Sequence, residues 1–166
     1  RMVSNSDDKV NQDIFDQTVA DQVKGRIGPF EDAFEFSQPC PTRRFGVMQQ
    51  TSDGRQKVRC IDDHADSEVN STCTVTGRIR MGQLQDIIDT ARSQHLAHPD
   101  HELNFFKTDF RSAYRCLPVR QDQRHLSRIL VWDPIQKKSR TARNWALPFG
   151  NIGSIYGWDR VGHTLA

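Results

Sequence analysis

Apolar side chains recur at helical spacing in two stretches of the chain. Residues 10–24 carry the first set, which comprises Val10, Ile14, Phe15, Val19 and Val23. Residues 81–94 carry the second set, which comprises Leu84, Ile87, Ile88 and Ala91. Because residues three and four apart share one face of a helix, both stretches are predicted to be helices. Gly25 falls where the first helix would end.

Short apolar runs between turn residues are typical of β-strands. Residues 45–48 and 57–62 flank Asp53-Gly54, a dipeptide that favours a tight turn, so they are predicted to form a hairpin. Residues 126–132 and 141–145 are predicted to form a second hairpin around a basic connection. Residues 31–44 contain two prolines and are predicted to be a loop.

The middle and the end of the chain add three further elements. Two phenylalanines lead into Asp109, which predicts a strand that ends in an acid. Residues 112–116 are predicted to form a turn of helix. After a turn at Gly150 the chain begins another helix, which carries Trp158, Val161 and Leu165. Separate helices and hairpins of this kind indicate an α+β fold.

The composition is that of a globular protein with a modest core, since 36% of the 166 residues are hydrophobic and 27% are charged. No apolar run approaches the ~18 residues of a membrane span, so no membrane contact is predicted. No secretory signal is recognised either, and the expected location is intracellular, in the cytoplasm or the nucleus. The cysteines at 40, 60, 73 and 116 form no Cys-x-x-Cys pair, so neither zinc nor a disulfide framework is indicated.

The net charge of +2 is unevenly distributed along the chain. Residues 107–143 carry ten lysines and arginines against three aspartates, and they include the second hairpin. Such an excess is typical of contact with a polyanion such as a nucleic acid. A solvated basic face is the commoner explanation where a charge excess stands alone.

Two groups of potential metal ligands have simpler explanations. Asp62 and Asp63 would point to opposite sides of a strand, so one is expected to pair with an arginine and the other to cap a turn. Three histidines are spaced three residues apart: His95, His98 and His101. Pro99 breaks the helical face on which these histidines would meet, so a solvated loop is predicted there.

Three separated motifs follow one another along the chain. They are Lys57-Val58-Arg59 with Ile61-Asp62-Asp63, then Asp109-Phe110-Arg111-Ser112-Ala113-Tyr114, then Leu147-Pro148-Phe149-Gly150 with Gly153-Ser154. In this order, over residues 44–156, they resemble the fingers and upper palm of a retroelement reverse transcriptase, which is an RNA-directed DNA polymerase. The resemblance implies an α/β fingers subdomain over residues 1–103. Residues 104–166 would then form part of a palm, with an incomplete antiparallel sheet and helices on one face.

The resemblance also implies roles for single residues. Asp109 would be the catalytic aspartate and would bind Mg²⁺, with the Phe110 carbonyl completing the metal's shell. Tyr114 would lie beneath the deoxyribose and exclude a 2′-hydroxyl group. Arg59 would stack on the incoming base and hold the triphosphate, a task that suits a planar guanidinium group. The complete nucleotide-binding set would be Lys57, Arg59, Phe110, Arg111, Ser112, Ala113, Tyr114, Phe149 and Gly150.

Further contacts are implied for the third motif and for the rest of the parent protein. Contacts with the template and primer would come from Leu147, Pro148, Gly153 and Ser154. The expected partners are an RNA or DNA template–primer, a deoxynucleoside triphosphate, and the remaining palm and thumb of the polymerase.

The chain departs from the pattern of the family at three places. Gln49 and Gln50 stand where lysines are usual, and Ile155 stands where proline is usual. The motif with paired aspartates is not found, and Asp159 has no neighbouring acid. Because two Mg²⁺ ions need more than one carboxylate, the segment alone is expected to be inactive and the activity to belong to the intact parent.

Two other interpretations stay open. A non-catalytic remnant of a retroelement would bind nucleic acid through the basic hairpins and the region of Arg59, without chemistry. A structural α+β domain would use Asp109 as a cap and leave its basic residues solvated. Only the polymerase interpretation predicts that Asp109, Arg59 and Tyr114 converge on one cleft.

Overall fold

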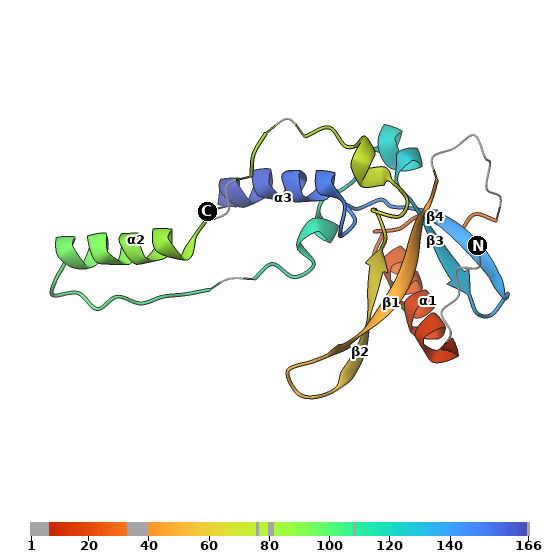
Figure 1. Cartoon of the computed structure of the whole chain (residues 1–166), viewed down its shortest axis with the longest axis horizontal. Coiled ribbons are helices and arrows are strands. Elements are labelled where there is room, and N and C mark those ends of the chain that lie inside the picture. Colours follow the sequence, from red (N-terminus) through yellow and green to blue (C-terminus); the bar gives the residue numbers. More distant parts are fainter. Residues whose placement is uncertain (1–6, 33–39, 76, 80–81, 108, 166) are drawn as a thin grey trace. The chain divides into compact units, whose positions relative to one another are not determined.

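The computed structural model describes residues 7–32, 40–75, 77–79, 82–107 and 109–165, and of residues 163 and 165 it describes the backbone alone (Figure 1). The chain forms two compact units. Unit 1 combines Arg1–Thr74 with Ser112–Ala166, and unit 2 is Val75–Arg111. Parts of three predicted features lie outside the described residues: positions 33–39 of the predicted loop, Met81 at the start of the second predicted helix, and the side chain of Leu165.

Helix α1 (Asp8–Val23) forms where the sequence predicts a helix, and both of its ends are capped. The Asp7 side chain accepts hydrogen bonds from the backbone N–H groups of Lys9 and Val10, at 2.8 and 3.4 Å. Beyond the other end, Gly25 has a φ of +67°, a left-handed conformation that glycine adopts without strain. The predicted helix end at Gly25 is therefore confirmed.

The buried face of α1 includes Ile14 and Phe15 of the apolar set and differs from that set further along. Val19 and Val23, which share the helical spacing, are 37% and 85% exposed. Thr18 is buried in their place, and its hydroxyl donates a hydrogen bond to the Ile14 carbonyl at 2.8 Å. Because this bond satisfies the hydroxyl within the helix, a polar residue can occupy the inner face.

Four strands of the described residues form one sheet in the order β2-β1-β3-β4 (Figure 1). They are β1 (Thr42–Gln50), β2 (Gln56–Asp62), β3 (Arg128–Asp133) and β4 (Lys138–Arg143). Strands β1 and β2 pair antiparallel, and so do β3 and β4, which confirms both predicted hairpins. Strands β1 and β3 pair in parallel, so the sheet is mixed, whereas β3 and β4 of the predicted palm portion pair antiparallel as predicted. A parallel pair needs a long connection between its strands, and its register is not encoded in a local turn.

The core of unit 1 lies between α1 and one face of the sheet (Figure 1). Its buried apolar members are Ile14, Val58 and Val131 in one cluster and Ile27, Ile129 and Ala142 in another. The helix approaches closest at Gly46 of β1, where an added Cβ would lie 2.8 Å from side-chain carbons of Val10 and Val58. The small residue at this position therefore allows α1 to lie directly on the sheet.

Three short 3₁₀ turns and one helix complete unit 1: η1 (Val69–Thr72), η2 (Ala113–Cys116), η3 (Gln121–Leu126) and α3 (Ile152–Leu165). Turn η2 confirms the helical turn predicted at residues 112–116, and α3 confirms the helix predicted after Gly150. Turn η3 occupies the point at which the third strand was predicted to begin. That strand begins two residues later, at Arg128.

Unit 2 contains helix α2 (Leu84–Ala97), which confirms the second predicted helix. Its apolar side chains are largely open to solvent, and Leu84 and Ile87 are 72% and 54% exposed. Residues 102–107 and 109–110 contain no strand, so the predicted strand that ends in Asp109 is wrong for the described part of this segment. A strand needs a neighbouring strand to receive its hydrogen bonds, and the described residues of unit 2 contain none.

The fold as a whole is α+β, as predicted. Strands from the two predicted portions, residues 1–103 and 104–166, are neighbours in one sheet. Their assignment to fingers and palm stays a prediction. No helix among the described residues is long and apolar enough to cross a membrane.

Candidate functional site

Three aromatic side chains from separate elements of unit 1 meet at η2. The Tyr114 ring lies edge-on to the Phe149 ring, with centroids 5.2 Å apart and planes at 74°. It also lies edge-on to Trp158 of α3, at 6.2 Å and 85°. Edge-to-face pairs at such distances are favourable, so Tyr114 is held from two sides. The structure thus places Tyr114 of the second sequence motif directly beside Phe149 of the third.

Turn η2 is fixed to the body of unit 1 by a buried arginine that the sequence analysis counted only as part of a charge excess. The Arg115 guanidinium is 5% exposed and donates to Asp21 of α1 at 2.8 Å and to Asn144 at 3.1 Å. Ser112, which precedes the turn, has a φ of 64°, an uncommon conformation for a residue with a side chain. The chain therefore enters η2 through a constrained turn, and Tyr114 is presented from a fixed base.

The loop that carries Phe149 lies against the end of β2. Gly150 has a φ of +83°, and a Cβ added there would lie 3.4 Å from the Asp62 carbonyl oxygen and 3.6 Å from the His64 ring. Upstream, the Leu147 N–H donates to the Leu117 carbonyl at 2.9 Å. The third motif is thus adjacent to the first motif at Asp62, as well as to the second at Tyr114.

Asn70 in η1 binds this loop through its side chain, and the sequence analysis did not identify it. Its Nδ2 donates to the Gly150 carbonyl at 3.0 Å, and its Oδ1 accepts from the Ile152 N–H at 3.0 Å. The two contacts span 80 and 82 residues of sequence, so no local pattern could have revealed them.

His64 is a second residue beside this loop that the sequence analysis did not identify. It is 3% exposed, and its Nδ1 lies 3.2 Å from the Thr42 hydroxyl, which in turn lies 3.1 Å from the Ser67 hydroxyl. The ring also lies next to the Phe149 backbone, a contact that favours the charged form of the imidazole. Burial lowers the pKa of His64, and the charge of Arg44 acts in the same direction, while Asp62 opposes both. The neutral imidazole is therefore the form that fits this position.

The acids of the first motif have the structural roles expected of them. Arg44 donates to both carboxylate oxygens of Asp62, at 2.7 and 2.8 Å, and the pair is almost fully buried. Asp63 accepts a hydrogen bond from the Asp66 N–H at 3.0 Å and so caps a turn. Among the described residues no group of three acidic, histidine or cysteine side chains is arranged to hold a metal ion.

Lys57 and Arg59 lie on the exposed face of the first hairpin. In the β1–β2 register Lys57 is opposite Gln49 and Arg59 is opposite Val47. Alternate strand residues share a face, so both cations point away from α1, towards which Val58 is buried. Neither cation makes an ion pair with any described residue. Lys57 also borders a polar hollow of about 440 Å³ at the start of α1.

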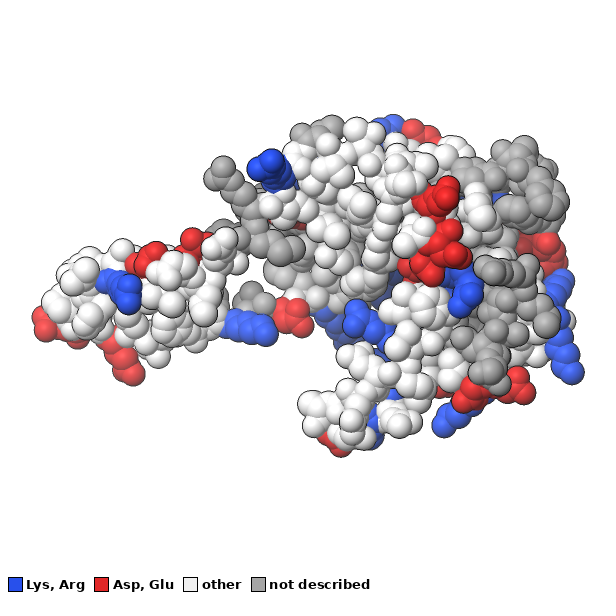
Figure 2. Space-filling view, viewed as in Figure 1, with Lys and Arg blue, Asp and Glu red and all other residues white. Residues whose placement is uncertain are grey.

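Most cations of the second hairpin are ion-paired within the fold. Four of them are ion-paired: Arg128, Lys138, Arg140 and Arg143. Glu31 pairs with the first and the last at 2.8 Å each, and Asp32 pairs with the middle two at 3.2 and 2.7 Å. On the face drawn in Figure 2, basic and acidic surfaces are interspersed over unit 1. This hairpin therefore offers fewer unpaired cations for the predicted phosphate contact than its sequence indicates.

The remaining residues of the third motif differ in their exposure. Pro148 and Ser154 are buried, and Gly153 is exposed. The Ser154 N–H donates to Asn151 at the start of α3, while its hydroxyl has no partner among the described residues. The predicted template contacts of Leu147, Pro148, Gly153 and Ser154 stay predictions. Gly153 is the member of the four that is most accessible in unit 1.

Asp109, Phe110 and Arg111 belong to unit 2, so the structure describes them apart from the aromatic cluster of Tyr114. All three are exposed. A single carboxylate does not complete a site for two Mg²⁺ ions, which need several oxygen ligands, so the described residues alone do not fit the implied metal pair. The convergence of Asp109 with Arg59 and Tyr114 stays a prediction.

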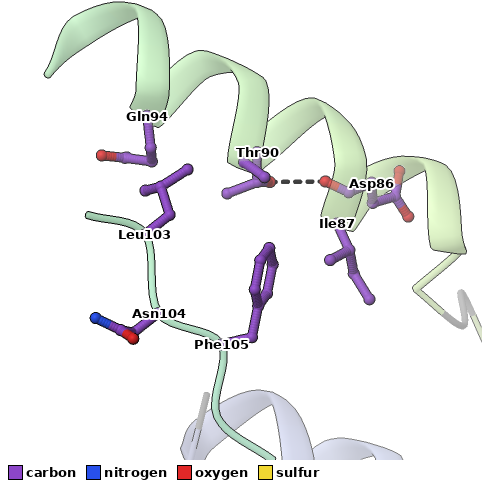
Figure 3. Close-up of a pocket in the computed structure, with 8 residues that line it drawn as sticks. Asp86, Ile87, Thr90, Gln94, Leu103, Asn104 and Phe105 are labelled. Atoms are coloured by element: carbon purple, nitrogen blue, oxygen red, sulfur yellow. Dashed lines mark hydrogen bonds between the residues drawn. The ribbon is translucent and has the colours of Figure 1, made fainter. Parts of the chain in front are cut away.

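Unit 2 contains an apolar hollow of about 370 Å³ between α2 and the segment that follows it (Figure 3). Leu103 and Phe105 face Ile87, Thr90 and Ala91 across it. The Thr90 hydroxyl donates to the Asp86 carbonyl at 2.7 Å, so its methyl group is left for the hollow. None of the site residues predicted from the sequence lines this hollow.

No model of a known protein family and no curated protein sequence matches the chain.

Proposed function

We propose that the chain is the fingers and upper-palm portion of an RNA-directed DNA polymerase of a retroelement, which in its intact parent adds deoxynucleotides to a primer by two-Mg²⁺ phosphoryl transfer. The contact that supports this proposal most is the edge-on packing of Tyr114 and Phe149. These residues come from the second and third motifs, which are far apart in the sequence. A structural domain without a shared site gives no reason for the two motifs to meet.

The position of Gly150 supports the same proposal. Its backbone lies against Asp62 and His64 at the end of β2, the strand that carries Lys57 and Arg59. Parts of all three motifs are therefore neighbours in unit 1. A nucleotide site assembled from several distant segments requires such an arrangement, because base, sugar and phosphates need contacts on different sides.

Within this proposal each part of the chain has a limited task. Tyr114 supplies the surface under the sugar, and its position is set by two aromatic neighbours. Arg59 is exposed and free of ion pairs with described residues, so its guanidinium is available for a phosphate. The metal ions and the chemical step are assigned to the complete polymerase, because the described residues offer only Asp109 for the metal.

Primer extension on an RNA template tests the proposal directly. The intact parent protein is compared with its Asp109→Ala variant, and extension is expected from the first and not from the second. Asp159→Ala is the matched control, since this aspartate lies outside the three motifs and has no role in the proposed site. Loss of extension in both variants, or in neither, would contradict the assignment of Asp109.

A non-catalytic nucleic-acid-binding protein is the second candidate function. The observation in its favour is the pair Lys57 and Arg59, which are exposed cations free of ion pairs with described residues. Such a pair supports phosphate binding without any metal. No extension by the wild-type parent, together with salt-sensitive RNA binding that is unchanged in Asp109→Ala, would establish this alternative.

A further inference from the structure

The side chain of Asn70 holds the loop that carries Phe149 through two hydrogen bonds, which we call the clasp. It donates to the Gly150 carbonyl and accepts from the Ile152 N–H, both at 3.0 Å. One amide therefore binds the chain on both sides of Asn151, between the motif loop and the first turn of α3. An asparagine side chain can do this because it carries a donor and an acceptor at once.

The clasp is itself held in place. The Asn70 backbone N–H donates to the His64 carbonyl at 3.2 Å, and the Asn70 carbonyl accepts from the Cys73 N–H at 3.3 Å. His64 in turn fills the space beside Gly150 and contacts Thr42 of β1. These contacts hold the backbone of Asn70 at the position from which its side chain reaches the loop.

The loop transmits its position to Tyr114 through Phe149. Phe149 immediately precedes the residue that Asn70 binds, and its ring meets Tyr114 edge-on at 5.2 Å. Trp158 holds the other side of Tyr114. If the Gly150 carbonyl is released, Phe149 gains freedom to move, and Tyr114 loses one of the two rings that define its place.

We propose that Asn70 is a positioning residue, which fixes the Phe149–Gly150 loop so that Tyr114 keeps the geometry needed to discriminate a deoxyribose from a ribose. The inference rests on the proposed function, because it assigns the sugar contact to Tyr114. Asn70 touches neither the sugar nor the phosphates. It acts on selectivity through the loop.

Two substitutions separate this role from a general effect on stability. Asn70→Ala removes both hydrogen bonds. Asn70→Asp keeps an acceptor for the Ile152 N–H at the start of α3, where the helix dipole favours a negative charge, but it cannot donate to the Gly150 carbonyl. Ser71→Ala is the control, since it removes one hydrogen bond of the same turn, from Ser71 Oγ to the Glu68 carbonyl, that does not reach the loop.

The test is the ratio of kcat/KM for a deoxynucleoside triphosphate to that for the matching ribonucleoside triphosphate, measured in primer extension by the intact parent. Both Asn70 variants are expected to lower this ratio about tenfold, the change that loss of one such hydrogen bond supports. Ser71→Ala is expected to leave it unchanged. A purely structural role would lower both kcat/KM values together and leave the ratio as it is.

The outcomes distinguish this inference from the function on which it rests. If wild-type parent extends and discriminates, and Asn70→Ala and Asn70→Asp keep the same ratio, the positioning role is overturned while the polymerase stands. If wild-type parent does not extend at all, both proposals fall. Amide hydrogen exchange of the 166-residue chain tests the clasp without activity. Exchange at residues 150–152 that is equally slow in wild type and Asn70→Ala would also overturn it.

Discussion

Several buried polar residues of unit 1 find partners for their charges and hydrogen bonds inside the fold. Arg44 is the clearest case, because its guanidinium binds both oxygens of Asp62 and also donates to the Thr18 hydroxyl at 3.2 Å. Burial works against the charge of both ions, but Arg44 outweighs it and holds the pKa of Asp62 below its ordinary value. The same proximity raises the pKa of Arg44. Both groups are therefore ionised in the folded chain.

Removing one charge of this pair is expected to be costly. In Asp62→Asn the Arg44 guanidinium stays buried without its counter-ion, and the free energy of unfolding should fall by about 3 kcal/mol. Urea denaturation followed by circular dichroism measures the change. Asp53→Asn breaks the ion pair with Arg55 at the exposed hairpin tip and should leave the unfolding free energy nearly unchanged. Equal losses in the two variants would show that the buried pair has no special role.

His64 makes the stability of unit 1 depend on pH. Its pKa in the folded chain lies below the ordinary value of 6.5, chiefly because burial disfavours the charged ring. Just below pH 6.5 the His64 side chain is therefore protonated in the unfolded chain and still neutral in the folded chain. The unfolding free energy should fall as the pH drops below this value, by at most about 1.4 kcal/mol per pH unit from this group. The loss ends once the pH is below the pKa of the folded form.

Denaturant titrations between pH 7 and pH 5 test this expectation. His64→Gln should flatten the pH dependence relative to wild type, whatever its effect on stability at neutral pH. His125→Gln is the control, because His125 is exposed in η3 and its replacement should leave the wild-type slope intact. If the unfolding free energy of His64→Gln depends on pH as steeply as that of wild type, His64 is not the source of the pH dependence.

At the scale of elements, the packing of α1 on β1 and β2 determines which residues are tolerated in the strands. The inner face of the helix presents Val10 and Ile14 to the sheet, and the strand opposite them carries Gly46. A Cβ at this position would lie 2.8 Å from side-chain carbons of Val10 and Val58, closer than Cβ contacts in real proteins come, and 3.0 Å from Ile14. The glycine is therefore needed for space rather than for backbone conformation.

Gly46→Ala is expected to destabilise the chain by about 1–3 kcal/mol, because the helix must shift or its side chains must leave their preferred rotamers. Gly162→Ala is the matched control, for which the opposite effect on stability is expected. Gly162 lies in α3 with no atom near an added Cβ, so alanine should stabilise the helix by up to about 1 kcal/mol. Thermal unfolding of both variants gives the comparison. A neutral Gly46→Ala would mean that α1 does not approach the strand this closely.

Local elements of this fold could be predicted from the sequence, whereas contacts between distant segments could not. Periodicity and the Asp53-Gly54 turn predict α1, α2 and both hairpins, because these signals act over a few residues. The parallel pairing of β1 with β3 joins residues 87 positions apart, such as Thr42 and Ile129, and no turn specifies it. The burial of Thr18 on the inner face of α1 was not predicted, because Thr18 satisfies its own hydroxyl within the helix.

The candidate site likewise combines residues that the sequence identified with residues that only the fold reveals. Tyr114 and Phe149 were identified by resemblance, and their contact in the structure joins two of the motifs. Asn70 and His64 carried no sequence signal of a role beside this loop, because their importance comes from a loop that lies far along the chain. Side-chain clasps of this kind become visible only when the tertiary fold is known.

At the scale of the whole molecule, the cations that make no ion pair among the described residues are distributed differently from the charged residues as a whole. The sequence places most of its basic excess in residues 107–143, yet the four cations of β3 and β4 form ion pairs with Glu31 and Asp32. These acids reach β4 because residues near them bridge to its outer edge, at Ile27 with Asn144 and at Glu31 with Thr141. The first hairpin carries Lys57 and Arg59, which are exposed and make no ion pair with a described residue.

Nucleic-acid binding is therefore expected to depend on the first hairpin more than on the second. Replacing Lys57 and Arg59 together with alanine should weaken RNA binding and reduce the slope of log Kd against log salt by about 1.4, since each phosphate contact on a single strand contributes about 0.7. Lys138→Ala with Arg140→Ala removes the same number of cations from the second hairpin, but these already pair with Asp32, so the slope should change little. Fluorescence anisotropy with a labelled RNA, measured over a range of salt concentrations, gives both slopes. A larger loss from the second pair would mean that Asp32 releases its cations to the nucleic acid on binding.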